Sequence, residues 1–477
     1  MTIVTGRRGN GAGLLALALG LALGLSGCGD RIIYRNGPDF VAPPNDAGGF
    51  LGYSAVESRR TTCGNCHIGK QAGWEGTAHA DAWATLESSG HAQDFCRACH
   101  SVSSRGNAVD NENVGWVATG LERYQDVQCE SCHGPGLTHV TNPDAVDTKP
   151  LAALSVGVDM EGGCGECHSG THRPFVEEWS ESKHALISTY RHNNPSCSGC
   201  HNGKEVLKSW GVKSTFLEQE GDGGHIAITC AVCHDPHDAR HEGQLRFAID
   251  VPSVEQNLCM KCHHKRGQPD LASPQRGPHS PEGPLLLGEA GWLPPNFAYP
   301  PGALVGSHGS DRNPRLCATC HVNDYQFRDP LTDAFQVRAT GHSFQAIPCA
   351  DAEGVPTGER DCQMTQRSFR SCTECHLSET AARSALSVAL DRLDRLATEA
   401  EALLARVPAS EFSTTDNVYT TAEGAKFNVG LARKKGSAAH NPFLVEALLI
   451  ASIRQLEIDY GVSASRGVSL TSELAPR

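Results

Sequence analysis

The chain has 477 residues, of which 50 are Gly and 26 are Pro, while aromatic side chains make up only 6%. This composition excludes a large conventional hydrophobic core and indicates a loop-rich chain in which bound cofactors supply packing material. The formal net charge of -13 excludes nucleic acid as the natural partner and favours partners with cationic patches.

The N-terminus has the pattern of an export signal. Arg7 and Arg8 precede an apolar run over residues 14–25, which is too short to span a membrane as a helix. We expect residues 1–27 to be removed as a signal peptide. The string Leu-Ser-Gly-Cys that ends at Cys28 resembles a bacterial lipobox, in which the cysteine carries the lipid.

Lipidation of Cys28 would anchor the exported chain to a membrane, with residues 28–60 as a tether. Gly29, not Asp, follows the cysteine, which favours the outer membrane and a periplasmic or surface-facing protein. The alternative is an ordinary signal-peptidase site near Cys28, which would leave a free thiol.

Nine copies of the motif C-x-x-C-H follow, and they contain 18 of the 21 cysteines. The cysteine pairs and the adjoining histidines are Cys63, Cys66 and His67; Cys96, Cys99 and His100; Cys129, Cys132 and His133; Cys164, Cys167 and His168; Cys197, Cys200 and His201; Cys230, Cys233 and His234; Cys259, Cys262 and His263; Cys317, Cys320 and His321; Cys372, Cys375 and His376.

This motif binds haem covalently. Two thiols at this spacing add to the two vinyl groups of one haem, and the next residue then supplies the proximal imidazole of the iron. The sequence therefore predicts nine c-type haems. Zinc is the alternative to haem at these cysteines. A zinc site would combine two cysteine pairs, which leaves one of the nine pairs unmatched, and it would not need His after the second cysteine of every pair. Repetition and the lack of a βαβ pattern exclude a thioredoxin-like redox motif.

An iron that only transfers electrons usually has a second strong axial ligand. Methionine cannot supply nine, because only Met160, Met260 and Met364 follow the signal peptide, whereas 14 of the 23 histidines lie outside the motifs. Bis-histidine ligation is the economical interpretation, and it implies lower potentials than His/Met ligation.

The first six motifs contain a duplication. Cys63, Cys96 and Cys129 recur 101 residues later, so residues 61–250 are predicted to be two copies of a three-haem unit. Trp74-Glu-Gly-Thr-Ala-His79 in the first copy corresponds to Trp179-Ser-Glu-Ser-Lys-His184 in the second. Similarly, Cys-His-Gly-Pro-Gly-Leu-Thr-His139 corresponds to Cys-His-Asp-Pro-His237.

These strings resemble a multihaem cytochrome family that includes the tetrahaem electron carrier of ammonia oxidisers and the octahaem and pentahaem nitrogen-cycle enzymes. The resemblance covers residues 61–376 and implies that His79, His139, His184 and His237 bind haems attached elsewhere in the chain. Three further histidines lie in Gly/Pro loops like those that carry distal ligands in the family: His279, His308 and His342.

The remaining histidines are weaker candidates. His91, His192 and His225 each lie five residues before a motif cysteine, whereas His172, His241 and His264 are interpreted as surface or supporting residues. His440 lies in Ala-His-Asn-Pro, which resembles a segment near the end of the pentahaem nitrite reductases, but a solvent-exposed or packing histidine is the preferred interpretation.

The C-terminal region is predicted to be helical. Apolar residues recur at helical spacing over residues 386–407, before Pro408, and further helices are expected over about 422–435 and over 441–460, before Gly461. Their apolar stripes are expected to form a core, with an intersubunit coiled contact as the alternative. Upstream, Cys349 and Cys362 carry no adjacent His and are expected to form a disulfide, with two free thiols as the alternative.

The expected fold is mainly α with irregular loops, wrapped around a haem chain and ending in a helical bundle. Residues 251–376 would form a three-haem segment with long loops, and residues 377–477 the helical segment. The expected function is electron transfer between periplasmic or outer-membrane redox proteins. The alternatives are an oxidoreductase acting on a small nitrogen or sulfur oxyanion at one five-coordinate haem, and a subunit of a cytochrome filament. No motif has Lys in place of the proximal His, which disfavours the enzyme.

Nine complete motifs predict nine covalent haems per chain. The intact mass of the purified protein should exceed that of the processed polypeptide by nine haems. A smaller excess, with zinc present in the sample, would contradict the central prediction.

Overall fold

The computed structural model describes residues 42–154, 156, 162–170, 173–212, 216–218, 225–329, 331–416 and 418–474. The predicted signal peptide and the candidate lipidation site Cys28 lie outside these residues. Contacts divide the chain into Met1–Ala42 and Pro43–Arg477, and every helix and strand of the described residues belongs to the second unit.

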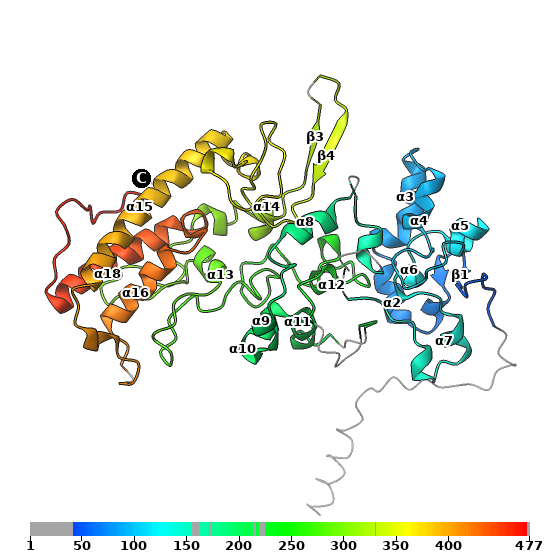
Figure 1. The fold of residues 1–477 in the computed structure, drawn as a ribbon, viewed down its shortest axis with the longest axis horizontal. Helices are drawn as coiled ribbons and strands as arrows, with labels where there is room; N and C mark the ends of the chain where they lie inside the picture. The colour runs from blue at the N-terminus through cyan, green and yellow to red at the C-terminus, as the bar shows by residue number, and fades with distance from the viewer. Residues whose placement is uncertain are drawn as a thin grey trace, which may run out of the picture. The chain divides into compact units, whose positions relative to one another are not determined.

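Short helices joined by loops make up most of this unit (Figure 1). They are α2 (Ile68–Trp74), α3 (Ala82–Ser88), α4 (Arg97–His100), α5 (Gly115–Thr119), α6 (Cys129–His133), α7 (Leu137–Thr141), α8 (Phe175–Glu181), α9 (Thr189–Asn193), α10 (Pro195–His201), α11 (Gly203–Ser209), α12 (Cys230–Cys233), α13 (Glu282–Leu286) and α14 (Cys317–His321). The longer helices come last: α15 (Glu379–Leu404), α16 (Thr421–Ala432), the short α17 (Ser437–His440) and α18 (Pro442–Tyr460).

The strands are few and form two antiparallel pairs. β1 (Tyr53–Ala55) pairs with β2 (Arg60–Thr61), and β3 (Tyr325–Arg328) pairs with β4 (Phe335–Ala339) as a projecting hairpin (Figure 1). The expectation of a mainly α and loop-rich fold is therefore confirmed. No described helix has the length and apolarity needed to cross a membrane.

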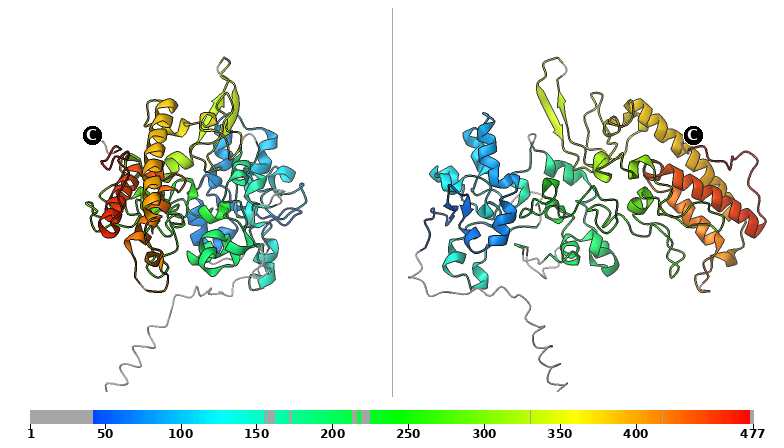
Figure 2. Two further views of the ribbon diagram at one scale, coloured as in Figure 1. Left: turned by 60° about the vertical axis from the view of Figure 1, so that its left-hand side comes forward. Right: turned by 180° about the vertical axis from the view of Figure 1, so that it is seen from behind.

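The C-terminal helices pack together as the apolar periodicity predicted. Helices α15, α16 and α18 lie side by side (Figure 2), and their buried faces form the largest apolar cluster of the described chain, which includes Leu396, Leu403, Leu431, Leu449 and Ile453. Local sequence fixes the helix ends. The Ser378 side chain accepts a hydrogen bond from the N–H of Ala381 at the start of α15, and Asn441 caps α18 before Pro442. Gly461 ends α18 with a φ of 63°, in the region that favours glycine.

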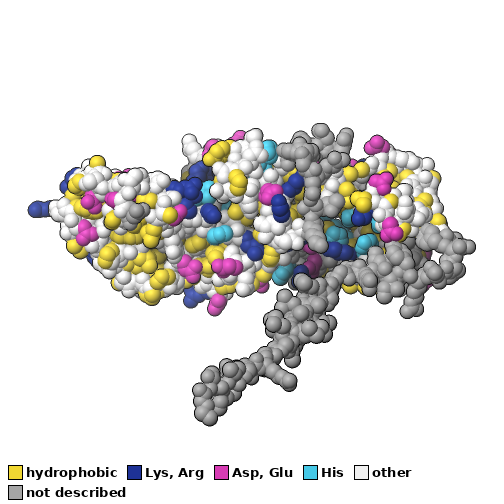
Figure 3. Space-filling view, turned by 90° about the horizontal axis from the view of Figure 1, so that it is seen from below, with side chains coloured by type: hydrophobic (Ala, Val, Ile, Leu, Met, Phe, Trp, Pro, Cys, Tyr) yellow, Lys and Arg dark blue, Asp and Glu magenta, His cyan; other side chains and the backbone are white. Residues whose placement is uncertain are grey.

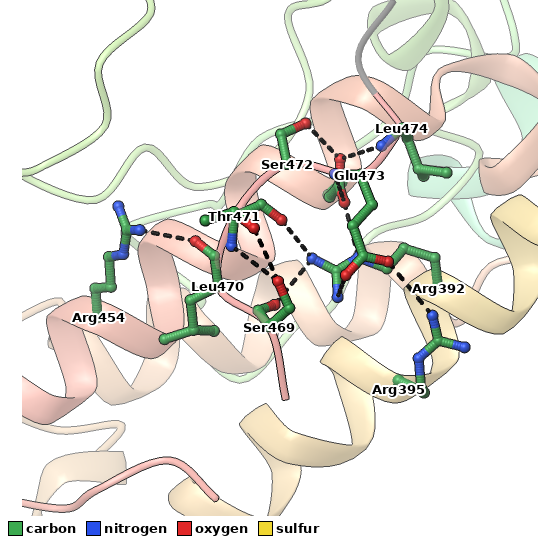
Figure 4. A network of polar contacts seen from close by, with 10 residues as sticks. Arg392, Arg395, Arg454, Ser469, Leu470, Thr471, Ser472, Glu473 and Leu474 are labelled. Carbon is green, nitrogen blue, oxygen red and sulfur yellow. Dashed lines mark hydrogen bonds and ion pairs between the residues drawn. The ribbon is translucent and has the colours of Figure 1, made fainter. Parts of the chain in front are cut away.

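A buried ion pair fastens the C-terminal tail to this bundle (Figure 4). The side chains of Arg392 in α15 and Glu446 in α18 are 2% and 1% exposed, and Arg392 Nε donates to Glu446 Oε1 at 2.8 Å. Arg392 also donates to the carbonyls of Ser469 and Thr471, while Glu446 accepts from Ser472 Oγ and from the N–H groups of Glu473 and Leu474. Each buried charge is therefore satisfied by several partners, as burial requires.

Removal of one member of this pair should destabilise the bundle. Glu446→Ala leaves the Arg392 guanidinium buried without its carboxylate and is expected to lower the free energy of unfolding by about 3–5 kcal/mol. Urea unfolding followed by helical circular dichroism measures the change. Arg454→Ala, which removes an exposed side chain bonded to the Leu470 carbonyl, is the control and should cost less than about 0.5 kcal/mol.

The same pair predicts a pH dependence. Burial alone would raise the pKa of Glu446, but the hydrogen bonds from Arg392 and the tail outweigh it and lower that pKa. The stabilisation should therefore be present at neutral pH and decline as the pH falls below the usual carboxyl range. An acid-unfolding curve of the bundle identical in the wild type and Glu446→Ala would contradict this account.

Candidate haem sites

Each C-x-x-C-H motif forms about one turn of helix, which sets the direction of its three functional side chains. We number the motifs, and the sites they form, 1 to 9 in chain order. The N–H of the motif histidine donates to the carbonyl of the first cysteine at 2.9–3.0 Å in motifs 1, 4, 6, 7 and 9. Motifs 3, 5 and 8 lie in helices α6, α10 and α14. Both thiols and the imidazole therefore project from one rigid turn.

Among the residues that the structure describes, eight motif histidines face a second histidine from elsewhere in the chain. The distances between ring centres are 6.4 Å for His67 and His139, 6.1 Å for His133 and His237, 6.0 Å for His168 and His79, 6.3 Å for His201 and His279, 6.4 Å for His234 and His342, 6.2 Å for His263 and His184, 6.2 Å for His321 and His440, and 6.3 Å for His376 and His308.

This spacing fits one iron between two imidazoles. Nitrogens that bind one metal from opposite sides, each about 2 Å away, hold their ring centres about 6 Å apart. Zinc would instead need the thiols and imidazoles of one site around a single point. No group of three or more His, Cys, Asp or Glu side chains converges in this way among the residues that the structure describes.

The structure brings together all seven leading distal candidates and adds His440. Of the weaker candidates, His192 and His225 face each other, with 5.3 Å between ring centres, and His91 lies exposed at the end of α3. His264 Nδ1 bonds to the Met260 carbonyl at 2.7 Å. In motif 2, His100 Nδ1 lies 3.3 Å from the Ala82 carbonyl. The candidate His172 lies outside the described residues.

Hydrogen bonds at Nδ1 leave the Nε2 lone pair of these imidazoles available to a metal. Backbone carbonyls accept from His133, His234, His321 and His308, at 3.1, 2.6, 2.8 and 2.6 Å. Two imidazoles bond to carboxylates: His237 to Asp235 at 3.0 Å, and His263 to Glu282 at 3.4 Å. A carboxylate partner makes the imidazole a more basic ligand.

Burial keeps several of these imidazoles neutral, which is the form that binds a metal. It lowers the pKa of His168, His184, His342 and His440 to about 4. His263 differs. Burial works to lower its pKa, but the hydrogen bond to Glu282 and the charge of that carboxylate outweigh the effect and raise it.

The same contacts recur in the two predicted three-haem units. Trp74 Nε1 donates to the Val127 carbonyl at 2.9 Å, and Trp179 Nε1 to the Ile228 carbonyl at 2.8 Å. The N–H groups of these acceptor residues in turn donate to the carbonyls of His79 and His184, both at 3.1 Å. Each tryptophan thereby positions the histidine that faces the first motif of the following unit.

Contacts between thiols of different motifs order the sites in space. Thiols of different motifs that lie near each other are Cys63 and Cys129, Cys99 and Cys167, Cys164 and Cys230, Cys200 and Cys262, and Cys259 and Cys317. Cys132 lies near Cys164, Cys233 near Cys259, and Cys320 near Cys372. Sites 1, 3, 4, 6, 7, 8 and 9 thus form a line, with site 2 beside site 4 and site 5 beside site 7.

Tertiary contacts position residues that sequence reasoning missed. Asn441, which caps α18, also donates to the carbonyls of Leu285 and Leu304 and so fixes His440 opposite His321. Glu178 accepts from the N–H of His342 at 2.8 Å and holds the loop that carries this histidine. The Ala-His-Asn-Pro string was the available signal for His440; nothing in the sequence pointed to Glu178.

The structure joins Cys349 and Cys362 as a disulfide.

Comparison with known proteins finds similar cytochromes. Residues 62–134 match the family model described as cytochrome c554 and c-prime. The chain is similar to the multihaem cytochrome MtrA of Shewanella baltica, 24% identical over 249 residues, and to the C-type polyhaem cytochrome OmcB of Geobacter sulfurreducens, 23% identical over 301 residues. The chain is thus similar to multihaem c-type cytochromes.

The matched regions cover 48% of this chain and 66% of MtrA, and 54% of this chain and 35% of OmcB. The chain therefore spans less than two thirds of each of these relatives. Among solved structures, the outer cell wall cytochrome OcwA aligns over 86% of this chain and 100% of its own chain, at 15% identity and a TM-score of 0.49.

The His440 and His321 pair predicts the effect of one substitution. His440→Ala should convert one low-spin haem to high spin, because alanine cannot bind iron and water is a weak-field replacement. Electron paramagnetic resonance of the oxidised protein would detect the new signal. His225→Ala is the matched control, since its ring faces His192, not a motif histidine, and should leave the spectrum unchanged.

Proposed function

We propose that this chain is an exported, lipid-anchored electron carrier that binds nine c-type haems and relays electrons between redox partner proteins. The observation that carries the proposal is the set of eight imidazole pairs at 6.0–6.4 Å. At these eight sites, an imidazole on each side of a bound iron would leave no open position for a substrate and would favour a low-spin centre that rearranges little when its charge changes.

The bound haems supply the one-electron redox chemistry. The polypeptide sets their spacing, orientation and ligands. Thiols of neighbouring motifs, such as Cys164 and Cys230, lie near each other, so haems bound there would be adjacent. Hydrogen bonds at Nδ1, such as that of His321 to the Phe344 carbonyl, fix the orientation of the imidazole rings. The line from site 1 to site 9 thereby provides a continuous route through the protein.

Export and anchoring rest on the N-terminal pattern and on the motif chemistry. Residues 1–27 have the character of a signal peptide, and Cys28 ends a lipobox-like string. The similarity to OcwA, which is described as an outer cell wall cytochrome, is consistent with a position outside the cytoplasm. We therefore propose the outer membrane as the site of the anchor and redox proteins as the partners.

The spin state of the unmodified protein tests this function. The oxidised cytochrome should give only low-spin ferric signals, and added nitrite, hydroxylamine or cyanide should not perturb them quickly, because each must first displace an imidazole. A high-spin haem that binds nitrite or hydroxylamine would overturn the carrier and favour the oxidoreductase. Full reduction by dithionite, measured by visible absorption, establishes that the haems are redox-active.

A further inference from the structure

Site 5 stands outside the line that joins the other sites. Its motif lies in α10, and its thiol contact to another motif is from Cys200 to Cys262 of site 7. The ring of His201 faces His279, which lies in the long loop of residues 265–281 before α13. An electron that enters here reaches the main line at site 7 directly.

Positive side chains surround this site although the chain as a whole is acidic. Arg266 Nε donates to the Gly277 carbonyl at 3.0 Å, two residues before His279. Arg276 and Gly277 line one cavity with Gly430 of α16 and with Arg433, which Lys434 follows in the chain. Arg191 lies in α9, which packs on α10, the helix that carries motif 5. Lys265 lies near the Cys200 thiol.

Several acidic groups near these five cations have other partners. Asp394 and Glu401 form ion pairs with Arg433, and Glu423 accepts from the N–H of Thr420. Asp270 lies near Arg266, Glu282 is hydrogen bonded to His263 of site 7, and Glu205 lies 3.8 Å from Lys208. The side site at motif 2 differs, because there Arg97 forms an ion pair with Asp94 at 2.9 Å. Lys and Arg, Asp and Glu, and His side chains all occur over the middle of the face in Figure 3.

Exposed apolar side chains precede Arg191 in the chain. Leu186, Ile187 and Tyr190 are 54%, 55% and 75% exposed, and they lie just before and within α9, which packs on α10. An apolar centre with a charged rim is the usual composition of a transient protein interface. We call the surface formed by Leu186, Ile187, Tyr190, Arg191, Lys265, Arg266, Arg276 and Lys434 the basic port.

We propose that the basic port docks an acidic redox protein, which donates electrons to the cytochrome through site 5. This inference rests on the proposed electron-transfer function. In each transfer the partner loses one electron and is oxidised, and the haem at site 5 gains that electron and is reduced, with no bond made or broken. The positive rim attracts the acidic partner, which raises the association rate at low ionic strength.

Charge reversal at the port tests the proposal in the full-length holoprotein. The port variant combines Arg191→Glu, Arg276→Glu and Lys434→Glu, all at exposed positions. The matched control combines Lys70→Glu, Lys149→Glu and Arg466→Glu, which are also at exposed positions. Lys70 lies near His133 and Lys149 lies near His139, at the site 1 end of the line. The probe is a plant-type [2Fe–2S] ferredoxin, an acidic one-electron donor.

The port variant should be reduced by this ferredoxin at least about tenfold more slowly than the wild type at low ionic strength, while the control stays within about twofold. The dissociation constant for oxidised ferredoxin should weaken by a similar factor, and both differences should shrink in 0.5 M salt because of screening. Equal losses of the reduction rate in the two variants, or no loss of that rate in the port variant, would overturn the docking proposal.

Reduction by dithionite separates the two proposals. Suppose that dithionite fully reduces all variants, that their spectra stay low-spin, and that ferredoxin reduces the port variant as fast as the wild type. The docking proposal then fails, and the carrier function stands. If the wild type itself has an open haem that reacts with nitrite, the carrier function fails whatever the ferredoxin result.

Discussion

Imidazoles from distant parts of the chain face each other in pairs, and the rest of this structure depends on that constraint. His133 faces His237, and His321 faces His440, so each pair closes a loop of roughly a hundred residues around one metal position. Closing such loops costs conformational entropy, and metal binding offsets that cost. The short helices and few strands follow from this, because the cofactors, not a continuous apolar core, organise residues 61–376.

The C-terminal bundle is built differently and connects to the haem region through one polar residue. Helices α15, α16 and α18 have an ordinary apolar core, closed by the buried pair of Arg392 and Glu446. Asn441 ties the start of α18 to the carbonyls of Leu285 and Leu304, and His440 immediately precedes it. The bundle therefore has a role beyond stability, since it places an imidazole opposite the proximal histidine of site 8.

The histidine contacts also link the two predicted three-haem units. The histidine positioned by Trp74 faces the first motif of the second unit, and the one positioned by Trp179 faces motif 7. Each predicted unit thus supplies a histidine to the motif that follows it. Sites 2 and 5 both lie beside the line of sites, and an ion pair between Arg97 and Asp94 distinguishes the surroundings of site 2.

The sequence by itself determined the chemistry of the proximal side, because spacing within five consecutive residues is a local property that one helical turn preserves. It also determined the three C-terminal helices, whose apolar period and caps are local. Only the tertiary structure decided which histidines face each other, the placement of His440, the carboxylates behind His237 and His263, and the order of the sites. These features depend on which loops contact each other in the folded chain, and neither local residue spacing nor local propensity determines those contacts.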